Sequence, residues 1–381
     1  MKKPGKQWLL HLLQYVSIVL IFALFFGSAC SQDQVQTEAG QVKVENLTGG
    51  LDHPWGMAFL PDGRLLVTER SGDLRILNKD NTLSDPLEGV PEVFARGQGG
   101  LLDVALDPEY ASNKYVYLSY AEPGDNNTAS TAVGRGKLEG NAITGFEVLF
   151  RQEPKVDGEN HFGGRIVFDS NNSFFLTMGE RFKFDPAQDL SNHLGTIVRI
   201  NKDGSVPDNN PFVDQENARS EIWSYGHRNI ESADIDPATG KLWIAEMGPK
   251  GGDELNQPVK AENYGWPVVS WGENYDGTDI PDPPTKPGFA DALIHWTPVI
   301  SPSGMRFYTG DMFSQWKGSA LIGGLTAKGV VRVTVNGGQA KEVERIDLGA
   351  RIRDVEQAPD GSVYVLTDQG NGNVWRLTRA N

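Results

Sequence analysis

One histidine of the sequence lies in surroundings that suit proton transfer. His161 is part of the stretch 158–165, Gly-Glu-Asn-His-Phe-Gly-Gly-Arg. The flanking glycines let another molecule approach the backbone closely. A histidine, whose ordinary pKa is about 6.5, can accept a proton at neutral pH. A lone histidine is more often structural, which is the role we assign to His193 and His295, so His161 is the candidate general base.

Three arginines could bind an anion near this base. Arg351 and Arg353 open an otherwise apolar strand, and Arg228 precedes another predicted strand. Guanidinium groups bind planar, multiply anionic ligands through forked hydrogen bonds. Strand starts adjoin loops and are often polar for that reason alone, but this explains an Arg-x-Arg pair poorly. We therefore interpret the arginines as part of a ligand site, together with other polar residues at strand starts: Gln98, Asn160, Asn229 and Ser301.

Carboxylates next to glycines indicate a possible site for a hard cation. Gly248 and Pro249 precede the run Lys-Gly-Gly-Asp-Glu, which ends at Glu254, and Tyr264 follows in Asn-Tyr-Gly-Trp-Pro. Glycines let backbone carbonyls and carboxylate oxygens turn toward one ion, as calcium requires. A plain turn is the alternative. The sequence has neither an EF-hand nor the spacing of a tetrahedral zinc site.

Six copies of one strand–turn–strand pattern must position these residues. The copies cover 57–67, 104–118, 166–176, 233–244, 304–322 and 355–366. Each is a hairpin signal, and each spacing leaves room for two further strands. Six such units predict an all-β fold, a six-bladed β-propeller of four-stranded antiparallel blades. A β-sandwich would not explain six copies. The candidate residues lie six to eight places before the turns, so we expect them at one mouth of a central channel.

The N-terminus is predicted to be an export signal. Residues 1–30 combine lysines, an apolar run from Trp8 to Phe26, and small residues before Cys30, the only cysteine. A retained membrane anchor is the alternative. Cys30 fits a lipoprotein cleavage site, which predicts an exported, periplasmic or extracytoplasmic protein lipid-anchored at Cys30. An ordinary cleavage site is the other possibility. Residues 31–41 are predicted to be a flexible tether and 42–381 the propeller. The net charge of −15 argues against a nucleic-acid partner.

Several motifs in order resemble those of the PQQ-dependent aldose sugar dehydrogenases, which are similar to the soluble glucose dehydrogenases. The matching segments are 97–105, 160–165, 224–229, 248–256, 263–267 and 351–355. The resemblance implies oxidation of aldose sugars to lactones. It makes His161 the general base and assigns Arg228 to catalysis and cofactor binding. It also implies an electron acceptor, a cytochrome or a quinone.

The resemblance further assigns the remaining site residues. Gln98, Asn229, Arg351 and Arg353 would join Arg228 at PQQ, with Gln98 and Asn160 contacting the sugar. Backbone oxygens of Gly248 and Pro249 would bind the Ca²⁺ that touches PQQ. Glu254 and the backbone of Tyr264 would belong to a second, structural Ca²⁺ site.

Two departures from the family pattern bear on the cofactor. Where the family reads Arg-Asn-Pro-Gln-Gly, this chain has Glu231 in place of the glutamine, and Thr326 stands where a lysine is usual. Both changes make the pocket less positive, which predicts weaker binding of the anionic cofactor. A redox-inactive propeller that binds a sugar or a protein at the cell envelope is therefore the alternative. A calcium-dependent lactone or ester hydrolase is disfavoured, because its channel would need converging carboxylates.

Overall fold

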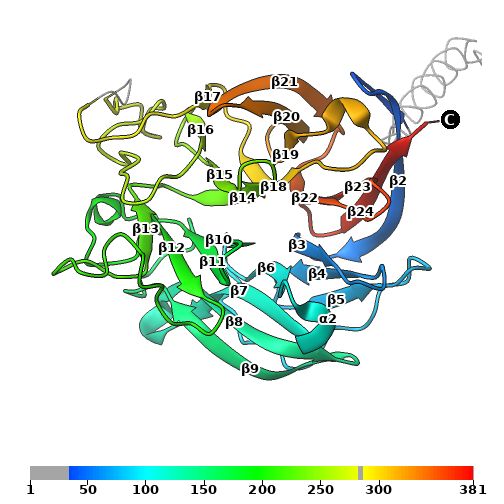
Figure 1. The fold of residues 1–381 in the computed structure, drawn as a ribbon, viewed down its shortest axis with the longest axis horizontal. Helices are drawn as coiled ribbons and strands as arrows, with labels where there is room; N and C mark the ends of the chain where they lie inside the picture. Colours follow the sequence, from blue (N-terminus) through cyan, green and yellow to red (C-terminus); the bar gives the residue numbers. More distant parts are fainter. Residues whose placement is uncertain (1–33, 282–285, 381) are drawn as a thin grey trace, which may run out of the picture. The chain divides into compact units, whose positions relative to one another are not determined.

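The computed structural model describes residues 34–281 and 286–380 of the 381-residue chain. In these residues six antiparallel sheets surround a central axis in sequence order (Figure 1). The predicted all-β, six-bladed propeller is thereby confirmed. The export signal, anchor and lipid site predicted for residues 1–30 lie outside the described residues.

Four blades have the predicted four strands, one has three and one has five. The strands of the first three blades are β3 (Pro54–Phe59), β4 (Leu65–Glu69) and β5 (Leu74–Leu77); β6 (Leu101–Leu106), β7 (Tyr115–Pro123), β8 (Ala129–Glu139) and β9 (Ala142–Arg151); β10 (Gly163–Phe168), β11 (Ser173–Met178), β12 (Thr196–Asn201) and β13 (Ile222–Tyr225). Those of the last three are β14 (Ile230–Asp236), β15 (Lys241–Glu246), β16 (Asp253–Asn256) and β17 (Ile294–Trp296); β18 (Pro302–Phe307), β19 (Ser319–Gly324), β20 (Gly329–Asn336) and β21 (Gln339–Asp347); β22 (Ile352–Gln357), β23 (Val363–Thr367), β24 (Gly372–Arg379), β2 (Gly40–Leu51) and β1 (Gln34–Thr37).

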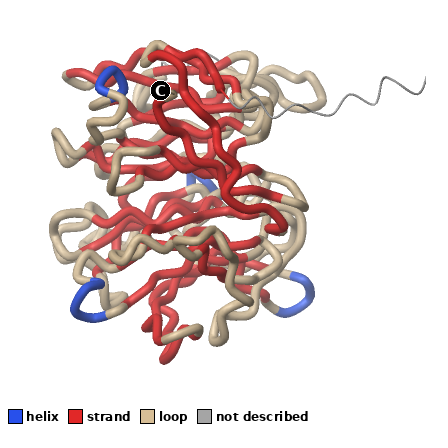
Figure 2. The backbone as a smooth tube through the Cα atoms, turned by 90° about the vertical axis from the view of Figure 1, so that its right-hand side faces the viewer, coloured by secondary structure: helices blue, strands red, loops and turns tan. Residues whose placement is uncertain are grey.

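Helical structure in the described residues is confined to short turns in loops (Figure 2). These are α2 (Tyr110–Asn113) and the 3₁₀ turns η1 (Asp125–Asn127), η2 (Asp185–Gln188) and η3 (Ser314–Trp316). None of the helices in this part of the chain has the length and apolar character needed to cross a membrane.

The innermost strand of every blade lines the channel and has a register shift near its start. The shifts fall between Pro54 and Met57 in the first blade and between Gly163 and Ile166 in the third, with equivalent shifts in the other four. A β-bulge changes the direction in which side chains point and locally ends the ladder. The site was predicted at the first residues of the inner strands. The side chains of these residues therefore need not point alternately to the two faces of the sheet.

The two ends of the described chain close the ring. Strand β2 pairs with β24, so the last blade is completed by the N-terminal segment. The flexible tether predicted for residues 31–41 is wrong from residue 34 onward, because Gln34–Thr37 pairs with β2 as strand β1. Val35 is buried against a cluster that includes Phe313 and Trp316. Four residues are too few for alternation to distinguish a strand from a linker.

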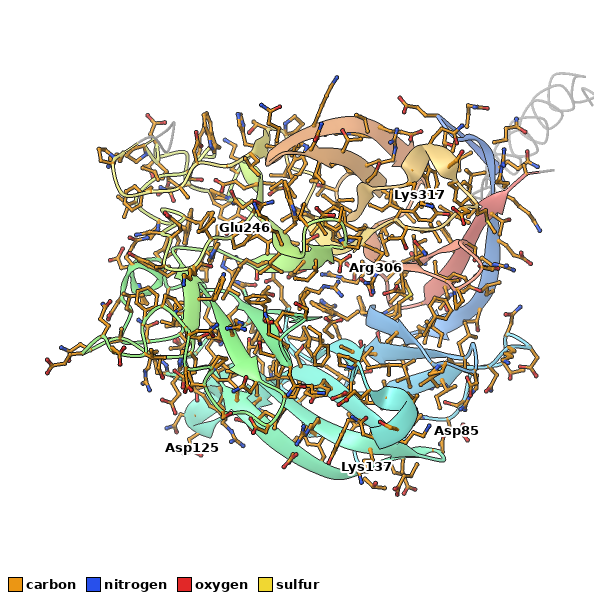
Figure 3. The ribbon with its side chains drawn as sticks, in the orientation of Figure 1. Asp85, Asp125, Lys137, Glu246, Arg306 and Lys317 are labelled. Carbon is orange, nitrogen blue, oxygen red and sulfur yellow. The ribbon has the colours of Figure 1, made fainter. Side chains whose placement is uncertain are left out.

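A cavity of about 550 Å³ lies in the channel toward the ends of the inner strands, away from His161. Arg306 projects beside it (Figure 3) and pairs with Glu356 and Asp234. Burial raises the pKa of both acids, which Arg306 and backbone N–H groups oppose. The charged groups of Arg306, Glu356 and Asp234 thus pair with one another, so we assign this cavity a structural role.

The burial of β1 can be tested by a pair of substitutions. Val35→Ser should lower the free energy of unfolding by about 1–2 kcal/mol, because a buried aliphatic side chain is lost. The adjacent and exposed Gln36→Ser should change it by less than about 0.5 kcal/mol. Equilibrium denaturation in urea measures both. Equal effects of the two changes would return residues 34–37 to the role of a tether.

Candidate functional site

The imidazole of His161 is held by a carboxylate at the channel mouth. Its Nδ1 lies 2.6 Å from Oε1 of Glu180, which stands just after the end of β11. The other oxygen of Glu180 accepts hydrogen bonds from the backbone N–H groups of Phe184, at 2.7 Å, and Lys183. An ionised carboxylate only accepts, so Nδ1 carries the proton and Nε2 presents a lone pair.

Burial keeps this imidazole neutral. His161 is 4% exposed, and its burial lowers its pKa below the ordinary value. The hydrogen bond to Glu180 raises the pKa, while the positive charge of Arg228 lowers it further. The net direction is downward, so His161 is available as a proton acceptor at neutral pH.

The guanidinium group of Arg228 forms hydrogen bonds with the loop after β15. Its Nη1 donates to the carbonyl oxygens of Met247, at 3.0 Å, and Gly248, at 2.7 Å. Its Nη2 donates to the hydroxyl of Tyr275 at 3.2 Å. The carbonyl of Gly248 is the oxygen that the resemblance assigns to Ca²⁺, so a cation there would have to displace or share this hydrogen bond.

Four aromatic rings form a wall next to Arg228. Tyr275, Phe182, Phe184 and Trp266 follow one another with centroid separations of 6.4, 5.1 and 5.6 Å. They border a cavity of about 380 Å³ that Pro249 also lines. Phe182 in turn meets the His161 ring edge-on at 5.2 Å. The wall offers flat apolar faces to a ring-shaped ligand beside the base.

Arg353 is already paired within the protein. Its Nη1 forms an ion pair with Glu231, and its Nη2 lies 3.1 Å from Asp368. Arg351 shares Asp368 at 2.7 Å. Burial of Asp368 favours the neutral acid, but the guanidinium groups of Arg353 and Arg351 hold its pKa at about 2. Two of the three predicted cofactor arginines, Arg351 and Arg353, therefore share the carboxylate of Asp368. Arg353 also pairs with the carboxylate of Glu231.

Asn229 connects this ion-pair network to the base. Its Oδ1 accepts the N–H of Gly163 at 3.1 Å, and its Nδ2 donates to Glu231 at 3.1 Å. Gln98 acts from the other side, because its Oε1 accepts the N–H of His161 at 2.7 Å. Asn160 is exposed next to the base.

Several guanidinium groups gather at the mouth together with the internal carboxylates. Arg70 faces the network as well, and its burial and the charge of Arg353 lower its pKa. Four guanidinium groups, from Arg70, Arg228, Arg351 and Arg353, thus lie at the mouth among buried carboxylates. Within the described residues, the buried Nε atoms of Arg228 and Arg353 have no hydrogen-bond partner. These unused N–H donors fit an anionic cofactor.

The second predicted cation site contains two facing carboxylates. Glu254 on β16 lies directly opposite Glu246 on β15. Burial, together with the charge of Glu246, raises the pKa of Glu254 well above its ordinary value. Asn256 donates to Glu254 at 3.1 Å, while its own buried Oδ1 lacks a partner in the described residues. Unneutralised oxygens of this kind fit a hard cation.

Acidic side chains alone do not complete that site. Among the described residues, no group of three or more His, Cys, Asp or Glu side chains could hold a metal ion. The side chain of Tyr264 is occupied elsewhere: its ring stacks on His227 at 4.7 Å and its hydroxyl bonds to the backbone at Gln257 and Val259. Only its backbone carbonyl could serve as the predicted ligand.

Comparison with known proteins places these features in a family. The family model "Glucose / Sorbosone dehydrogenase" matches residues 51–376. The chain belongs to this family. It is 45% identical over 359 residues to the aldose sugar dehydrogenase YliI of Escherichia coli, covering 92% of this chain and 97% of that protein.

Two solved structures extend the comparison. The soluble aldose sugar dehydrogenase of Escherichia coli in its apo form matches with a TM-score of 0.86 at 45% identity, over 89% of this chain and all of that one. The PQQ-bound form of an aldose sugar dehydrogenase from Streptomyces coelicolor matches with a TM-score of 0.72 at 28% identity, over 88% of this chain and 97% of that one.

The site residues predicted from the sequence leave out the acids that hold the site together. Glu180, Glu246 and Asp368 lie at or just after the ends of the second strands of three blades. Each binds a residue near the start of the first strand: His161, the N–H of Arg228, and Arg351. Glu69 does the same in the first blade through the N–H of Asp52. The recurrence at one phase of the repeat is a signal that could have found them.

The tautomer and charge of His161 can be tested by NMR. We expect its imidazole to titrate below about 6.5. Glu180→Gln should lower this pKa further, since the carboxylate stabilises the protonated ring. Histidine-labelled protein, with His161→Gln used to assign the resonance, gives both values. A pKa above that of a free histidine, or an increase in Glu180→Gln, would contradict the proposed environment.

Proposed function

We propose that this protein is a quinoprotein that oxidises aldose sugars to lactones with PQQ and Ca²⁺. The reaction removes a hydride from the anomeric carbon and a proton from its hydroxyl. The proposal rests chiefly on one observation: a neutral His161, oriented by Glu180, shares the channel mouth with arginines, of which Arg228 and Arg353 keep a buried Nε without a partner among the described residues. The family match and the PQQ-bound structural neighbour support it.

His161 acts as the general base in this proposal. Its Nε2 accepts the proton of the anomeric hydroxyl, and Glu180 stabilises the imidazolium that results, because its carboxylate bonds the Nδ1 proton. Bound PQQ would supply the hydride acceptor, and Ca²⁺ would supply a Lewis acid for the quinone. Burial of the imidazole excludes competing water from the proton acceptor.

The remaining site residues bind and orient. Arg228, Arg351 and Arg353, with Asn229, hold the carboxylates of PQQ. The Oε1 of Gln98 is used by His161, so its amide nitrogen and the exposed Asn160 are left to the sugar hydroxyls. Binding of PQQ exchanges part of the internal pairing of Arg353 for pairing with the cofactor.

Two calcium sites belong to the proposal. The carbonyls of Gly248 and Pro249 would hold the ion of the cofactor site, for which Arg228 has to release or share the carbonyl of Gly248. The N–H of Gly248 donates to Asp253 at 2.9 Å. Glu254, with the backbone carbonyl of Tyr264, holds the structural ion. The buried carboxylates of Glu246 and Glu254 support the second site, because a cation would neutralise them.

The proposed setting is outside the cytoplasm. The charged, apolar and small residues of segment 1–30 support export, and Cys30 supports a lipid anchor. An exported dehydrogenase needs an electron acceptor there, for which a cytochrome or a membrane quinone is proposed.

A redox-inactive propeller that binds a sugar or a protein at the cell envelope is the second candidate. The observation in its favour is that Glu231 and Asp368 partly neutralise the arginines that would hold PQQ. Equilibrium titration of the apo-protein with PQQ in the presence of Ca²⁺ separates the two functions, because this candidate requires that no saturable binding occurs.

Loss of the proposed base should abolish turnover without abolishing cofactor binding. In protein reconstituted with PQQ and Ca²⁺, His161→Ala should lower kcat for glucose by about 10²–10⁴-fold. The rate of the wild type should fall as the pH drops below the pKa of His161, since the protonated ring accepts no proton. Dye-linked oxidation measures both. His295→Ala, which removes an exposed histidine, should retain activity. Wild-type inactivity at saturating PQQ would overturn the proposal.

Removal of the Glu231 charge should tighten PQQ binding. Glu231→Gln should lower the Kd about tenfold, because Arg353 loses an internal anion and the cofactor loses a repulsive neighbour. Thr326→Lys should also lower it by adding a cation. Glu356→Gln is the matched control, since it breaks a buried pair with Arg306 at the other end of the channel. Calorimetric titration gives the Kd values. Unchanged affinity in Glu231→Gln and Thr326→Lys would refute the charge deficit.

A further inference from the structure

A single buried arginine forms hydrogen bonds with the backbone on both sides of the His161 side chain's attachment, in segment 158–161. Arg181 donates from Nη2 to the carbonyl of Gly158 at 2.6 Å and from Nε to that of Asn160 at 2.9 Å. Its backbone N–H donates to the carbonyl of His161 at 3.2 Å. Three carbonyls of the segment 158–161 thus converge on one residue.

The guanidinium group is anchored from two further sides. Its Nη1 donates to the carbonyl of Ala129 at the start of β8, and its plane lies 3.6 Å from the ring of Phe162. The side chain is 0% exposed. Arg181 therefore ties the segment 158–161 to a strand of the neighbouring blade, which fixes the segment relative to the propeller.

This cation has no carboxylate at ion-pair distance among the described residues. Burial lowers its pKa to about 10, and the more distant charges of Glu180 and Asp157 only partly oppose this. A buried charge is ordinarily paired. The hydrogen bonds of Arg181 to backbone carbonyls therefore replace the usual ion pair, and they bind the guanidinium group to the segment of His161.

The segment needs an external constraint because His161 is held in an unfavourable backbone conformation. Its φ is 55°, in the left-handed region, and Arg181 itself has φ of 60°. Such conformations persist only where the surroundings determine them. Glu180 fixes the imidazole ring, and the adjacent Arg181 fixes the backbone beneath it.

We propose that Arg181 is the positioning residue of the His161 base: its buried guanidinium holds segment 158–161 so that Nε2 of His161 faces the anomeric hydroxyl. This rests on the proposed function of His161. Arg181 touches neither sugar nor cofactor in this account, so it acts on turnover and not on ligand affinity. A displacement of about 1 Å in a catalytic group lowers rates about 10²-fold.

Two substitutions test this role in the full chain reconstituted with PQQ and Ca²⁺. Arg181→Lys keeps the charge but places its donors on a single nitrogen, which cannot reproduce the planar fork of Nε, Nη1 and Nη2. Arg181→Met keeps an unbranched side chain but donates nothing. Both should lower kcat for glucose at least tenfold, while KM and the Kd for PQQ stay within about twofold. If Arg181→Met does not fold, Arg181→Lys decides.

The control is Arg199→Lys in the same blade. Arg199 is 4% exposed but pairs with Asp169 and lies near Trp223, outside the site. It should lose thermal stability as the Arg181 variants do, yet retain kcat. A loss of kcat in Arg199→Lys equal to that in Arg181→Lys at matched Tm would overturn the proposal, as would wild-type kcat in both Arg181 variants.

Hydrogen exchange separates this inference from the proposed function. In apo-protein, the amides of His161 and Arg181 should exchange at least tenfold faster in Arg181→Lys than in the wild type, and those of β12 should not. If the wild type oxidises no sugar, the proposed function fails. Whether or not it does, unchanged amide exchange in Arg181→Lys would refute the proposal that Arg181 holds the segment. Faster exchange confined to residues 158–162 and 181 supports it in either case.

Discussion

Contacts between adjacent inner strands fix the whole propeller. Neighbouring blades do not share a backbone ladder around the channel, so side chains must join them. Asp103, Asp234 and Asp354 do this at alternate junctions, each accepting a backbone N–H from the inner strand of the next blade. Buried carboxylates are unfavourable unless they are hydrogen-bonded, and burial raises the pKa of all three, that of Asp354 to about 7.

Arg165 extends these contacts from the ring to the site. It pairs with Asp103 and Asp354 and donates to the carbonyls of Glu231 and Arg353. Those two residues form the buried ion pair at the mouth. The network that closes the ring thus also sets the separation of the cofactor-binding groups before any ligand arrives. Preorganised charges of this kind need little rearrangement when a ligand binds.

The sequence could predict the blades but not the ion pairs between their charged side chains. Repeated hairpins with Asp, Pro and Gly turns indicate inner strands, and they place His161, Arg228 and Arg353 at one mouth. The hairpin brings Asp368 near the start of β22, but it does not reveal that Asp368 binds both Arg351 and Arg353, because the register shift after Ile352 changes the direction in which side chains point. Carbonyl contacts are hidden for the same reason, since the sequence records no backbone geometry.

The left-handed backbone conformation of His161 arises from the fold and not from the site alone. His53 and Ser301, with φ of 49° and 51°, each precede an inner strand, as His161 does in its blade. The turn into an inner strand therefore favours this conformation in several blades, whatever residue is present. In the first blade His53 also has a carboxylate beside its ring, that of Asp52 at 2.8 Å. Among the described residues, His161 differs because it is buried and because the side chain of Arg181 binds its segment. Chemistry here depends on which side chains occupy a shared strained position, and strain alone does not mark the site.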